Sequence, residues 1–138
     1  MSYTIELSRR RWLTQSIFEL EFTNPDGLEF LPGQHIRFFF DGIDRDYTPV
    51  SLSNETTIKI CVKKVDQPRL SDHFSRCPEG ETFKIEGPFG HFLHQTANAL
   101  DIFIGTGTGV APFAAFACAG VKNFTLLQGA RSPDELIY

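Results

Sequence analysis

Cysteine is scarce in this sequence, and the few cysteines lie far apart. The 138 residues contain three of them, Cys61, Cys77 and Cys118. An iron–sulfur cluster needs four thiolates at close spacings, so this chain alone cannot hold one. The four histidines do not show the spacing of a metal-binding motif either, and no metal site is predicted. Dispersed cysteines, with no apolar signal core at the N-terminus, are typical of a reducing, cytoplasmic setting.

A basic stripe and a membrane-spanning segment are also lacking. The net charge is −4, which argues against a nucleic-acid partner. Residues 102–121 carry no charged side chain and would be long enough to cross a bilayer. However, several glycines and Pro112 interrupt this stretch in its middle. A strand, a glycine-rich turn and a helix explain it better than a membrane span does.

Phenylalanine, by contrast, is abundant. The chain has 14 phenylalanines and 41% hydrophobic residues, which indicates a packed core with a bias toward β-structure. Apolar and polar residues alternate between residues 4 and 88. Six antiparallel strands and one small helix are therefore predicted, as a closed or nearly closed barrel. The strands are expected around residues 5–7 and 18–22, at His35–Phe40, near residues 45–52, at Thr57–Val65 and at Thr82–Glu86, and the helix at Leu70–Cys77.

The pattern changes near Leu100. Leu100–Ile104 and Phe124–Gln128 are short apolar runs of the kind found in buried parallel strands, and Ala111–Ala119 between them is predicted to be helical. Ser132 would cap a further helix, with Pro133 at its first position. We therefore predict a β-barrel domain at residues 1–96 and an incomplete α/β, Rossmann-like segment at residues 97–138.

The stretch RDYTPVSL, residues 45–52, places unusual chemistry at the end of a strand. Arg45 and Tyr47 would point to the same face of that strand. A guanidinium suits a pyrophosphate, and a tyrosine offers a flat surface for a ring. Thr48 precedes a proline, so it should be extended, with its hydroxyl free to bond a ring nitrogen. Taken alone, the stretch is better explained as an edge strand with a surface arginine and a half-buried tyrosine.

A second candidate motif is GTGTGVAPF, residues 105–113. It follows a predicted strand and precedes a predicted helix, where exposed amides can bind a phosphate or the polar edge of a nucleotide. It is not the common dinucleotide fingerprint, because Val110 stands at the third glycine position. A glycine-rich connection without a ligand is the alternative interpretation.

The motifs gain meaning from their order. RDYTPVSL is followed by ICVKKV at residues 60–65, PRLS at 68–71, GPFGHF at 87–92, GTGTGVAPF at 105–113 and LLQGARSPDELIY at 126–138. This series resembles the ferredoxin–NADP reductase superfamily over nearly the whole chain. The resemblance implies a six-stranded antiparallel FAD-binding barrel with a small helix, followed by the start of an NAD(P)-binding domain.

The resemblance also implies roles for individual residues. Arg45 would bind the FAD pyrophosphate, Tyr47 would pack on the flavin, and Thr48 would bond the flavin N5 atom that accepts hydride. Thr106 would lie closest to flavin and nicotinamide, so Thr48 and Thr106 are the predicted catalytic residues. The other predicted cofactor-binding residues are Ser51; Cys61, Val62 and Lys63 through backbone groups; Arg69, Leu70 and Ser71 at the phosphates; Gly105, Gly107 and Gly109 in the nicotinamide-side loop; and Arg131 at the adenosine end.

The reaction of this family is hydride transfer from NAD(P)H to FAD, followed by electron transfer to a separate acceptor protein or to free flavin. The resemblance therefore predicts an FAD-dependent NAD(P)H reductase module. The acceptor could be a ferredoxin, a flavodoxin, an oxygenase or free flavin, and the choice between NAD and NADP stays open.

Three departures from the family pattern bear on this interpretation. Pro68 stands where the phosphate turn usually has glycine, which removes one amide donor. The stretch between Pro112 and Phe124 is short for a full crossover helix. A complete nucleotide domain would need on the order of 100 further residues. A partner chain or a homo-oligomer would then complete it. The alternative is a truncated flavin-binding or structural subunit without turnover.

Overall fold

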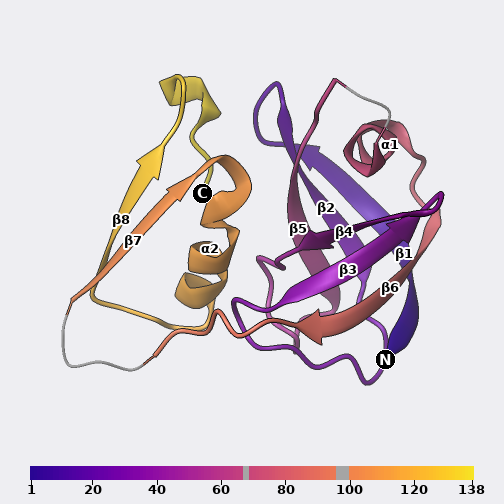
Figure 1. Ribbon diagram of the computed structural model, residues 1–138, viewed down its shortest axis with the longest axis horizontal. Helices are drawn as coiled ribbons and strands as arrows, with labels where there is room; N and C mark the ends of the chain where they lie inside the picture. The colour runs from indigo at the N-terminus through magenta and orange to yellow at the C-terminus, as the bar shows by residue number, and fades with distance from the viewer. Residues whose placement is uncertain (67–68, 96–99) are drawn as a thin grey trace.

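The computed structural model describes residues 1–66, 69–95 and 100–138 and shows two parts, a barrel and a C-terminal segment (Figure 1). The barrel comprises residues 2–89, and the C-terminal segment comprises residues 100–138. Pro68 and the predicted domain boundary between residues 96 and 97 lie outside the described residues.

Six antiparallel strands form the barrel, as predicted. Their spatial order is β4-β3-β6-β1-β2-β5, and every neighbouring pair is antiparallel. The strands are β1 (Ser2–Trp12), β2 (Ile17–Thr23), β3 (His35–Phe40), β4 (Ile43–Tyr47), β5 (Thr57–Lys63) and β6 (Thr82–Phe89).

The chain that follows β4 closes the barrel against β5. Pro49 forms an antiparallel bridge with Ile60, and the next amide, that of Val50, donates to the carbonyl of Lys59 at 2.8 Å. A proline has no N–H, so it suits a position where regular strand pairing ends. The two end strands of the sheet are thereby joined, which protects edges that would otherwise lie open.

Aromatic side chains fill the barrel. Alternate residues of each strand point inward, which explains the period of two in the sequence. The Phe22 ring lies 5.3 Å from that of Phe38 and 5.8 Å from that of Phe83. The short helix α1 (Leu70–Arg76) packs on this core through Leu70 and Phe74, which are both fully buried. The core therefore fixes α1 relative to the strands.

The C-terminal segment is a small parallel α/β unit. Its two strands pair in parallel, and α2 stands between them and the barrel (Figure 1). The Phe103 ring stacks on that of Phe113 in α2, with centroids 4.7 Å apart. The elements are β7 (Asp101–Thr106), the 3-10 turn η1 (Gly107–Val110), α2 (Ala111–Cys118), β8 (Phe124–Gly129) and the 3-10 turn η2 (Pro133–Glu135).

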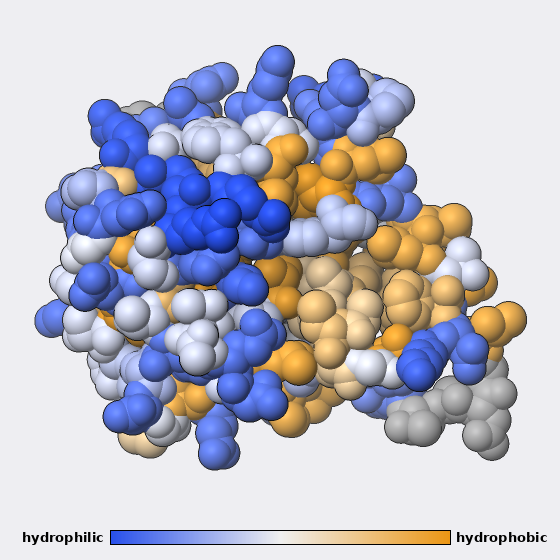
Figure 2. All heavy atoms as spheres, turned by 180° about the vertical axis from the view of Figure 1, so that it is seen from behind, coloured by the Kyte–Doolittle hydropathy of each residue, from blue (hydrophilic) through white to orange (hydrophobic). Residues whose placement is uncertain are grey.

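The prediction that both parallel strands are buried was wrong. Ile102 is 66% exposed, Ile104 is 70% exposed and Leu127 is 53% exposed. Successive side chains point to opposite faces, and α2 covers only the face that carries Phe103. Hydrophobic residues are correspondingly concentrated at the surface on the side of the C-terminal segment (Figure 2).

Several predicted boundaries also differ from the structure. β6 continues past Glu86 to Phe89, because its pairing with β3 extends to His35. β5 ends at Lys63 instead of Val65. Ser132 makes no side-chain cap bond, and only the 3-10 turn η2 follows it. The chain turns back instead and buries Ile137 against the barrel. No helix among residues 1–66, 69–95 and 100–138 is long and apolar enough to cross a membrane.

Candidate functional site

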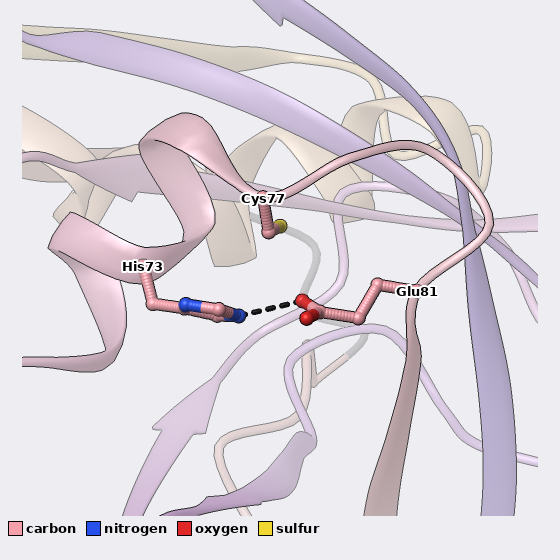
Figure 3. A group of neighbouring side chains, drawn as sticks. All are labelled: His73, Cys77 and Glu81. Carbon is pink, nitrogen blue, oxygen red and sulfur yellow. Dashed lines mark hydrogen bonds and ion pairs between the residues drawn. The ribbon is translucent and has the colours of Figure 1, made fainter.

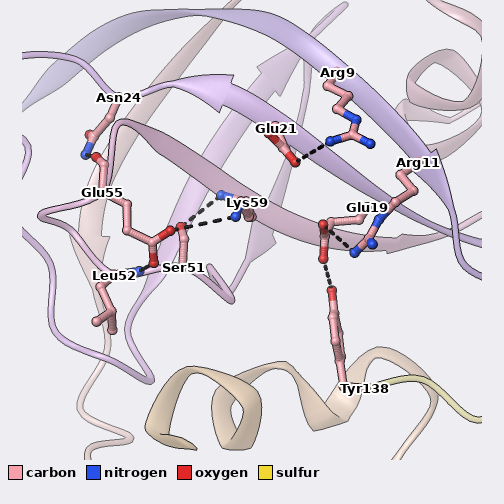
Figure 4. A network of polar contacts seen from close by, with 10 residues as sticks. All are labelled: Arg9, Arg11, Glu19, Glu21, Asn24, Ser51, Leu52, Glu55, Lys59 and Tyr138. Atoms are coloured by element: carbon pink, nitrogen blue, oxygen red, sulfur yellow. Dashed lines mark hydrogen bonds and ion pairs between the residues drawn. The ribbon is translucent and has the colours of Figure 1, made fainter. Parts of the chain in front are cut away.

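The second half of RDYTPVSL is hydrogen-bonded to β5. The Ser51 hydroxyl accepts a hydrogen bond from the Lys59 amide at 2.9 Å, and this serine is only 1% exposed. The loop that follows is tied down as well, since the Glu55 carboxylate accepts from the Leu52 amide at 2.8 Å (Figure 4). Ser51 therefore positions the motif, which holds its upstream residues at a fixed place on the barrel wall.

The first half of the motif places a guanidinium beside a neutral phenol, and the only hydrogen bond of that guanidinium among the described residues goes to the Asp44 carbonyl, at 2.6 Å. Asp46 is engaged by Arg37 at 2.8 and 3.0 Å, and this hydrogen bonding lowers the pKa of Asp46. Arg45 is exposed and has no acidic partner within the described residues. Tyr47 packs on Phe38 with ring centroids 5.6 Å apart, and burial raises the pKa of Tyr47 to about 12. A cation and an uncharged aromatic ring thus lie two residues apart on one strand face.

The first turn of α1 contains an unsatisfied polar group. Ser71 is 8% exposed, and its hydroxyl has no hydrogen-bond partner among the described residues. A buried hydroxyl without a partner is costly, so such a group commonly marks a ligand contact. Arg69 is exposed just before the helix. The α1 residue Phe74 touches Tyr47, with ring centroids 5.9 Å apart, which connects α1 to the RDYTPVSL strand.

The glycine-rich connection after β7 requires glycine at positions 105 and 107, whereas a Cβ on Gly109 would meet no other atom within 4 Å. A Cβ on Gly105 would come within 2.9 Å of a Val110 methyl and 3.3 Å of the Gly109 carbonyl oxygen. Gly107 has a φ of +53°, a conformation that favours glycine. The absence of side chains here lets β7 turn directly into η1 and α2.

A cavity of about 550 Å³ lies between the barrel and the C-terminal segment. Ile17 and Lys63, which pair across β2 and β5, line its barrel wall. The opposite wall is formed by Thr106, Gly107, Thr108, Gly129, Ala130, Arg131 and Glu135. The loop after β7 and the loop after β8 therefore meet a barrel strand at one hollow. In open α/β sheets, ligands bind in this position, outside the carboxyl ends of parallel strands.

Cys61 and Val62 point to opposite sides of β5. Val62 belongs to the barrel core, whereas Cys61 packs with Val110, Ala111 and Ile137 of the C-terminal segment. Burial raises the pKa of the Cys61 thiol to about 12. A thiol with so high a pKa is a poor nucleophile, and only the backbone of these two residues remains for a cofactor.

Two features of the interface were not predicted from the sequence. Ile17 and Glu135 line the cavity, although Ile17 lies in none of the motifs and Glu135 was not among the predicted site residues. Glu19 is 4% exposed and accepts a hydrogen bond from the Tyr138 hydroxyl at 2.6 Å (Figure 4). Glu19 occupies an outward position of β2, where the alternating pattern indicates exposure. Nothing local in the sequence indicates that the C-terminal segment covers this position.

Most of the predicted site residues fall into two groups. The first belongs to the RDYTPVSL stretch and to the start of α1, which contacts Tyr47 through Phe74. Its members are Arg45, Tyr47, Thr48, Ser51, Arg69 and Ser71. The second lines the cavity and includes Lys63, Thr106, Gly107 and Arg131. Gly105 and Gly109 shape the loop behind the cavity without lining it, and Leu70 is a core residue.

A family model for the oxidoreductase FAD-binding domain matches residues 5–94. The chain belongs to this family. The match spans all six barrel strands and α1, including both RDYTPVSL and Ser71. The resemblance to the ferredoxin–NADP reductase superfamily, inferred from the order of the motifs, is confirmed.

Individual relatives agree with this family membership. The chain is 34% identical over 110 residues to a probable dihydroorotate dehydrogenase B (NAD(+)) electron transfer subunit of Pyrococcus furiosus, covering 79% of this chain and 42% of the relative. It is 27% identical over 141 residues to the toluate 1,2-dioxygenase electron transfer component of Pseudomonas putida, covering 99% of this chain and 40% of the relative.

A solved structure of the ferredoxin reductase in carbazole 1,9a-dioxygenase shares the fold. Its TM-score is 0.89 at 24% identity, with 100% of this chain and 46% of that chain covered. The chain thus spans about two-fifths of the length of the curated relatives that it matches.

Proposed function

We propose that this chain is a flavin-dependent oxidoreductase module, in which NAD(P)H reduces FAD and the electrons pass to a separate acceptor. The observation that carries the proposal is the cavity walled on one side by the FAD-binding barrel and on the other by the glycine-rich loop. Bound FAD would supply the hydride and electron chemistry. The residues of the chain bind, orient and shield the reactants.

The group around Tyr47 fits a flavin nucleotide. The Arg45 guanidinium donates one hydrogen bond to the Asp44 carbonyl but has no carboxylate partner among the described residues, since Asp46 is engaged by Arg37, so its other nitrogens can pair with a pyrophosphate. The unpartnered Ser71 hydroxyl is a donor for a phosphate oxygen. Tyr47 stays uncharged at neutral pH, which suits packing against a flavin ring. Thr48, at the end of β4, would bond the flavin N5 atom.

The cavity fits the nicotinamide nucleotide. Thr106 would contact the nicotinamide from the end of β7, while the glycine at position 107 allows close approach of the backbone. Arg131 and Lys63 supply positive charge at the two walls for the phosphates of the dinucleotide. Thr48 and Thr106 are therefore the proposed catalytic pair, one from each part of the molecule.

A second candidate function is a flavin-binding or structural subunit without turnover of its own. The exposed apolar face of β7 and β8 favours it, because that face leaves the nucleotide-binding half uncovered. The relatives of the chain are also more than twice as long as the stretch that matches. In this case a partner chain or a second copy would complete the nucleotide domain.

The acceptor is proposed by analogy with electron-transfer components that serve oxygenases or dehydrogenases. It would be a ferredoxin-like protein, an oxygenase or free flavin.

The cysteines at positions 61, 77 and 118 are all free thiols, which supports a reducing, cytoplasmic setting.

The flavin site is tested by titrating the purified chain with FAD and with FMN while flavin fluorescence is measured. Ser71→Ala should weaken FAD binding about tenfold, the cost of one hydrogen bond to a charged group. Ser75→Ala is the matched control on the same helix, because its hydroxyl is already bonded to the Asp72 carbonyl. Equal effects of the two substitutions would contradict the phosphate site.

Turnover separates the two candidate functions. Steady oxidation of NADPH or NADH by the 138-residue chain, with FAD and an artificial electron acceptor present, supports the oxidoreductase module and excludes the subunit without turnover. Flavin binding without any NAD(P)H oxidation supports the second candidate.

A further inference from the structure

Three side chains of metal-ligating type converge beside α1. His73 lies in α1, Cys77 directly follows the last residue of that helix, and Glu81 comes from the chain just before β6 (Figure 3). Their nitrogen, sulfur and oxygen atoms all lie within 4.8 Å of one another. The cluster is far in sequence from RDYTPVSL and from the glycine-rich loop, and neither proposed nucleotide site uses it.

The three side chains are held in place by their surroundings. The His73 ring stacks on Phe40, with centroids 4.2 Å apart and planes inclined by 24°. The loop between Cys77 and Glu81 is pinned to β1, since Leu7 bonds to Gly80 at 2.7 Å and to Glu81 at 2.9 Å through backbone groups. A preorganised set of ligands loses less conformational entropy when it binds an ion.

We propose that His73, Cys77 and Glu81 form a binding site for a divalent transition-metal ion of the Zn²⁺ type. Zn²⁺ accepts imidazole nitrogen, thiolate sulfur and carboxylate oxygen in a tetrahedral arrangement, and three protein ligands leave a fourth position for water. The mixed set of soft and harder donors disfavours Mg²⁺ and Ca²⁺, which prefer oxygen alone.

Only small movements separate the observed cluster from a metal site. The His73 Nε2 and Glu81 Oε2 atoms lie 2.5 Å apart, whereas two such ligands of one tetrahedral Zn²⁺ lie about 3.3 Å apart. Metal binding would therefore replace the His73–Glu81 hydrogen bond by two coordinate bonds. Since all three atoms lie within 4.8 Å of one another, the Cys77 sulfur would approach the other two by no more than about 1.2 Å, a distance that side-chain rotation covers.

Burial and the Glu81 carboxylate raise the pKa of the Cys77 thiol, so the ion must displace its proton, and Arg10 offsets part of that cost. Its Nη2 atom lies 3.4 Å from the Cys77 sulfur, and its guanidinium also donates to the carbonyls of Phe74 and Cys77. The thiolate and carboxylate together carry a charge of −2, so a dication and Arg10 together leave a net charge of +1. Such outer contacts orient a ligand without occupying a coordination position.

The ion would clamp α1 to the start of β6. The same helix carries Leu70 in the core and the unpartnered Ser71 hydroxyl in its first turn. A metal ion at the C-terminal end of α1 would therefore stiffen the helix that is proposed to hold the flavin phosphates. The metal site itself does not depend on that role.

The site is tested with the full chain, stripped of metal and kept reduced. Calorimetric titration with Zn²⁺ should show one ion per chain. Co²⁺, used as a coloured substitute, should give a thiolate-to-metal charge-transfer band that disappears in Cys77→Ser. Glu81→Gln should weaken Zn²⁺ binding at least about tenfold, and its side chain can still bond to His73, so the fold is retained.

Two control variants make the outcome decisive. His94→Gln alters a comparable histidine–carboxylate pair, at 2.7 Å, which forms no metal-ligating cluster with a cysteine among the described residues, and Cys118→Ser removes the exposed thiol. Both should bind Zn²⁺ as the wild type does, and Zn²⁺ should raise the melting temperature in both but not in Glu81→Gln. Absence of Zn²⁺ binding by the wild type, or binding unaffected by Cys77→Ser and Glu81→Gln, would overturn the proposal.

Discussion

The barrel and the C-terminal segment of this chain differ in how completely they pair their backbone hydrogen-bonding groups and bury their apolar surface. The barrel strands form one continuous series that closes through Pro49, and their inner face is filled by fully buried residues such as Phe22 and Phe38. The C-terminal segment has two strands, one covering helix and an uncovered apolar face.

This difference assigns different tasks to the two parts. The barrel can hold Arg45, Tyr47 and Ser71 at fixed positions by its own packing. The C-terminal segment is placed by contacts with the barrel, among them Ile137 against Ile17 and the Tyr138–Glu19 hydrogen bond. We therefore expect flavin binding to depend on the barrel, and nicotinamide binding to depend on how well the segment is held against it.

The largest expected effect is a loss of stability, which we compare at one phenylalanine in each part. Phe22→Ala in the barrel core should lower the free energy of unfolding by about 3–5 kcal/mol, because a fully buried ring leaves a cavity. Phe103→Ala in the half-buried sheet of the C-terminal segment should cost about 1–2 kcal/mol. Urea unfolding followed by circular dichroism measures both. A larger cost for Phe103→Ala would contradict the view that the barrel holds most of the stability.

The next effect separates the two nucleotide sites. Arg45→Ala should weaken FAD binding by about ten- to a hundredfold, because it removes a charge-assisted contact to phosphate. Arg131 lines the cavity instead. Arg131→Ala should therefore leave FAD affinity nearly unchanged while weakening NAD(P)H binding. Fluorescence titrations of each variant measure this contrast. Similar losses of FAD affinity in both would show that the assignment of roles is wrong.

A smaller effect concerns stability at high pH. Burial raises the pKa of Tyr47 to about 12 in the barrel, and that of Cys61 to about 12 where the segment covers it. Both groups keep their protons longer in the folded state. The stability they contribute is therefore fully present below pH 9 and declines as the pH rises toward 12.

Two substitutions divide this decline between the two parts. Tyr47→Phe should reduce the decline in the free energy of unfolding that begins near pH 10. Cys61→Ala should reduce the decline that begins near pH 9. The free energy of unfolding, measured by urea titration from pH 8 to 11, checks both. Curves that coincide with the wild type would mean that neither group is shielded from solvent.

The smallest effect is expected on the exposed face of β7. Ile104→Lys should change the free energy of unfolding by less than about 0.5 kcal/mol, because Ile104 is 70% exposed. Size-exclusion chromatography of the wild type and the variant shows whether a second copy covers this face. A destabilisation of several kcal/mol, or a shift from dimer to monomer, would show that the face is buried in an assembly.

The barrel could be predicted from the sequence because its signals are local. Alternation in stretches such as residues 18–22, together with turns such as Asp41–Gly42, indicates strands and their ends. The parallel strands were predicted to be buried because apolar runs such as Leu100–Ile104 look alike whether one face or both are covered. Coverage depends on neighbouring elements, which a local pattern does not contain.

The site could be predicted in part for a similar reason. Motifs point to Arg45, Tyr47 and Thr106 as candidates because their chemistry is visible in the residue types, and their roles stay predictions. The cavity wall formed by Ile17 and the burial of Glu19 depend on long-range contacts with the C-terminal segment. The convergence of His73, Cys77 and Glu81 could not be predicted because it depends on how the loop before β6 folds back beside α1.

The most direct test of the central claim is a visible spectrum of the purified chain with FAD, recorded without oxygen before and after NADPH or NADH is added. We expect yellow flavin bands that bleach with either nucleotide, more slowly in Thr106→Val than in the wild type. A colourless protein after incubation with FAD, or with FMN, would contradict the assignment of the barrel as a flavin site. Bands that persist after both nucleotides would contradict the claim that the cavity delivers nicotinamide to the flavin.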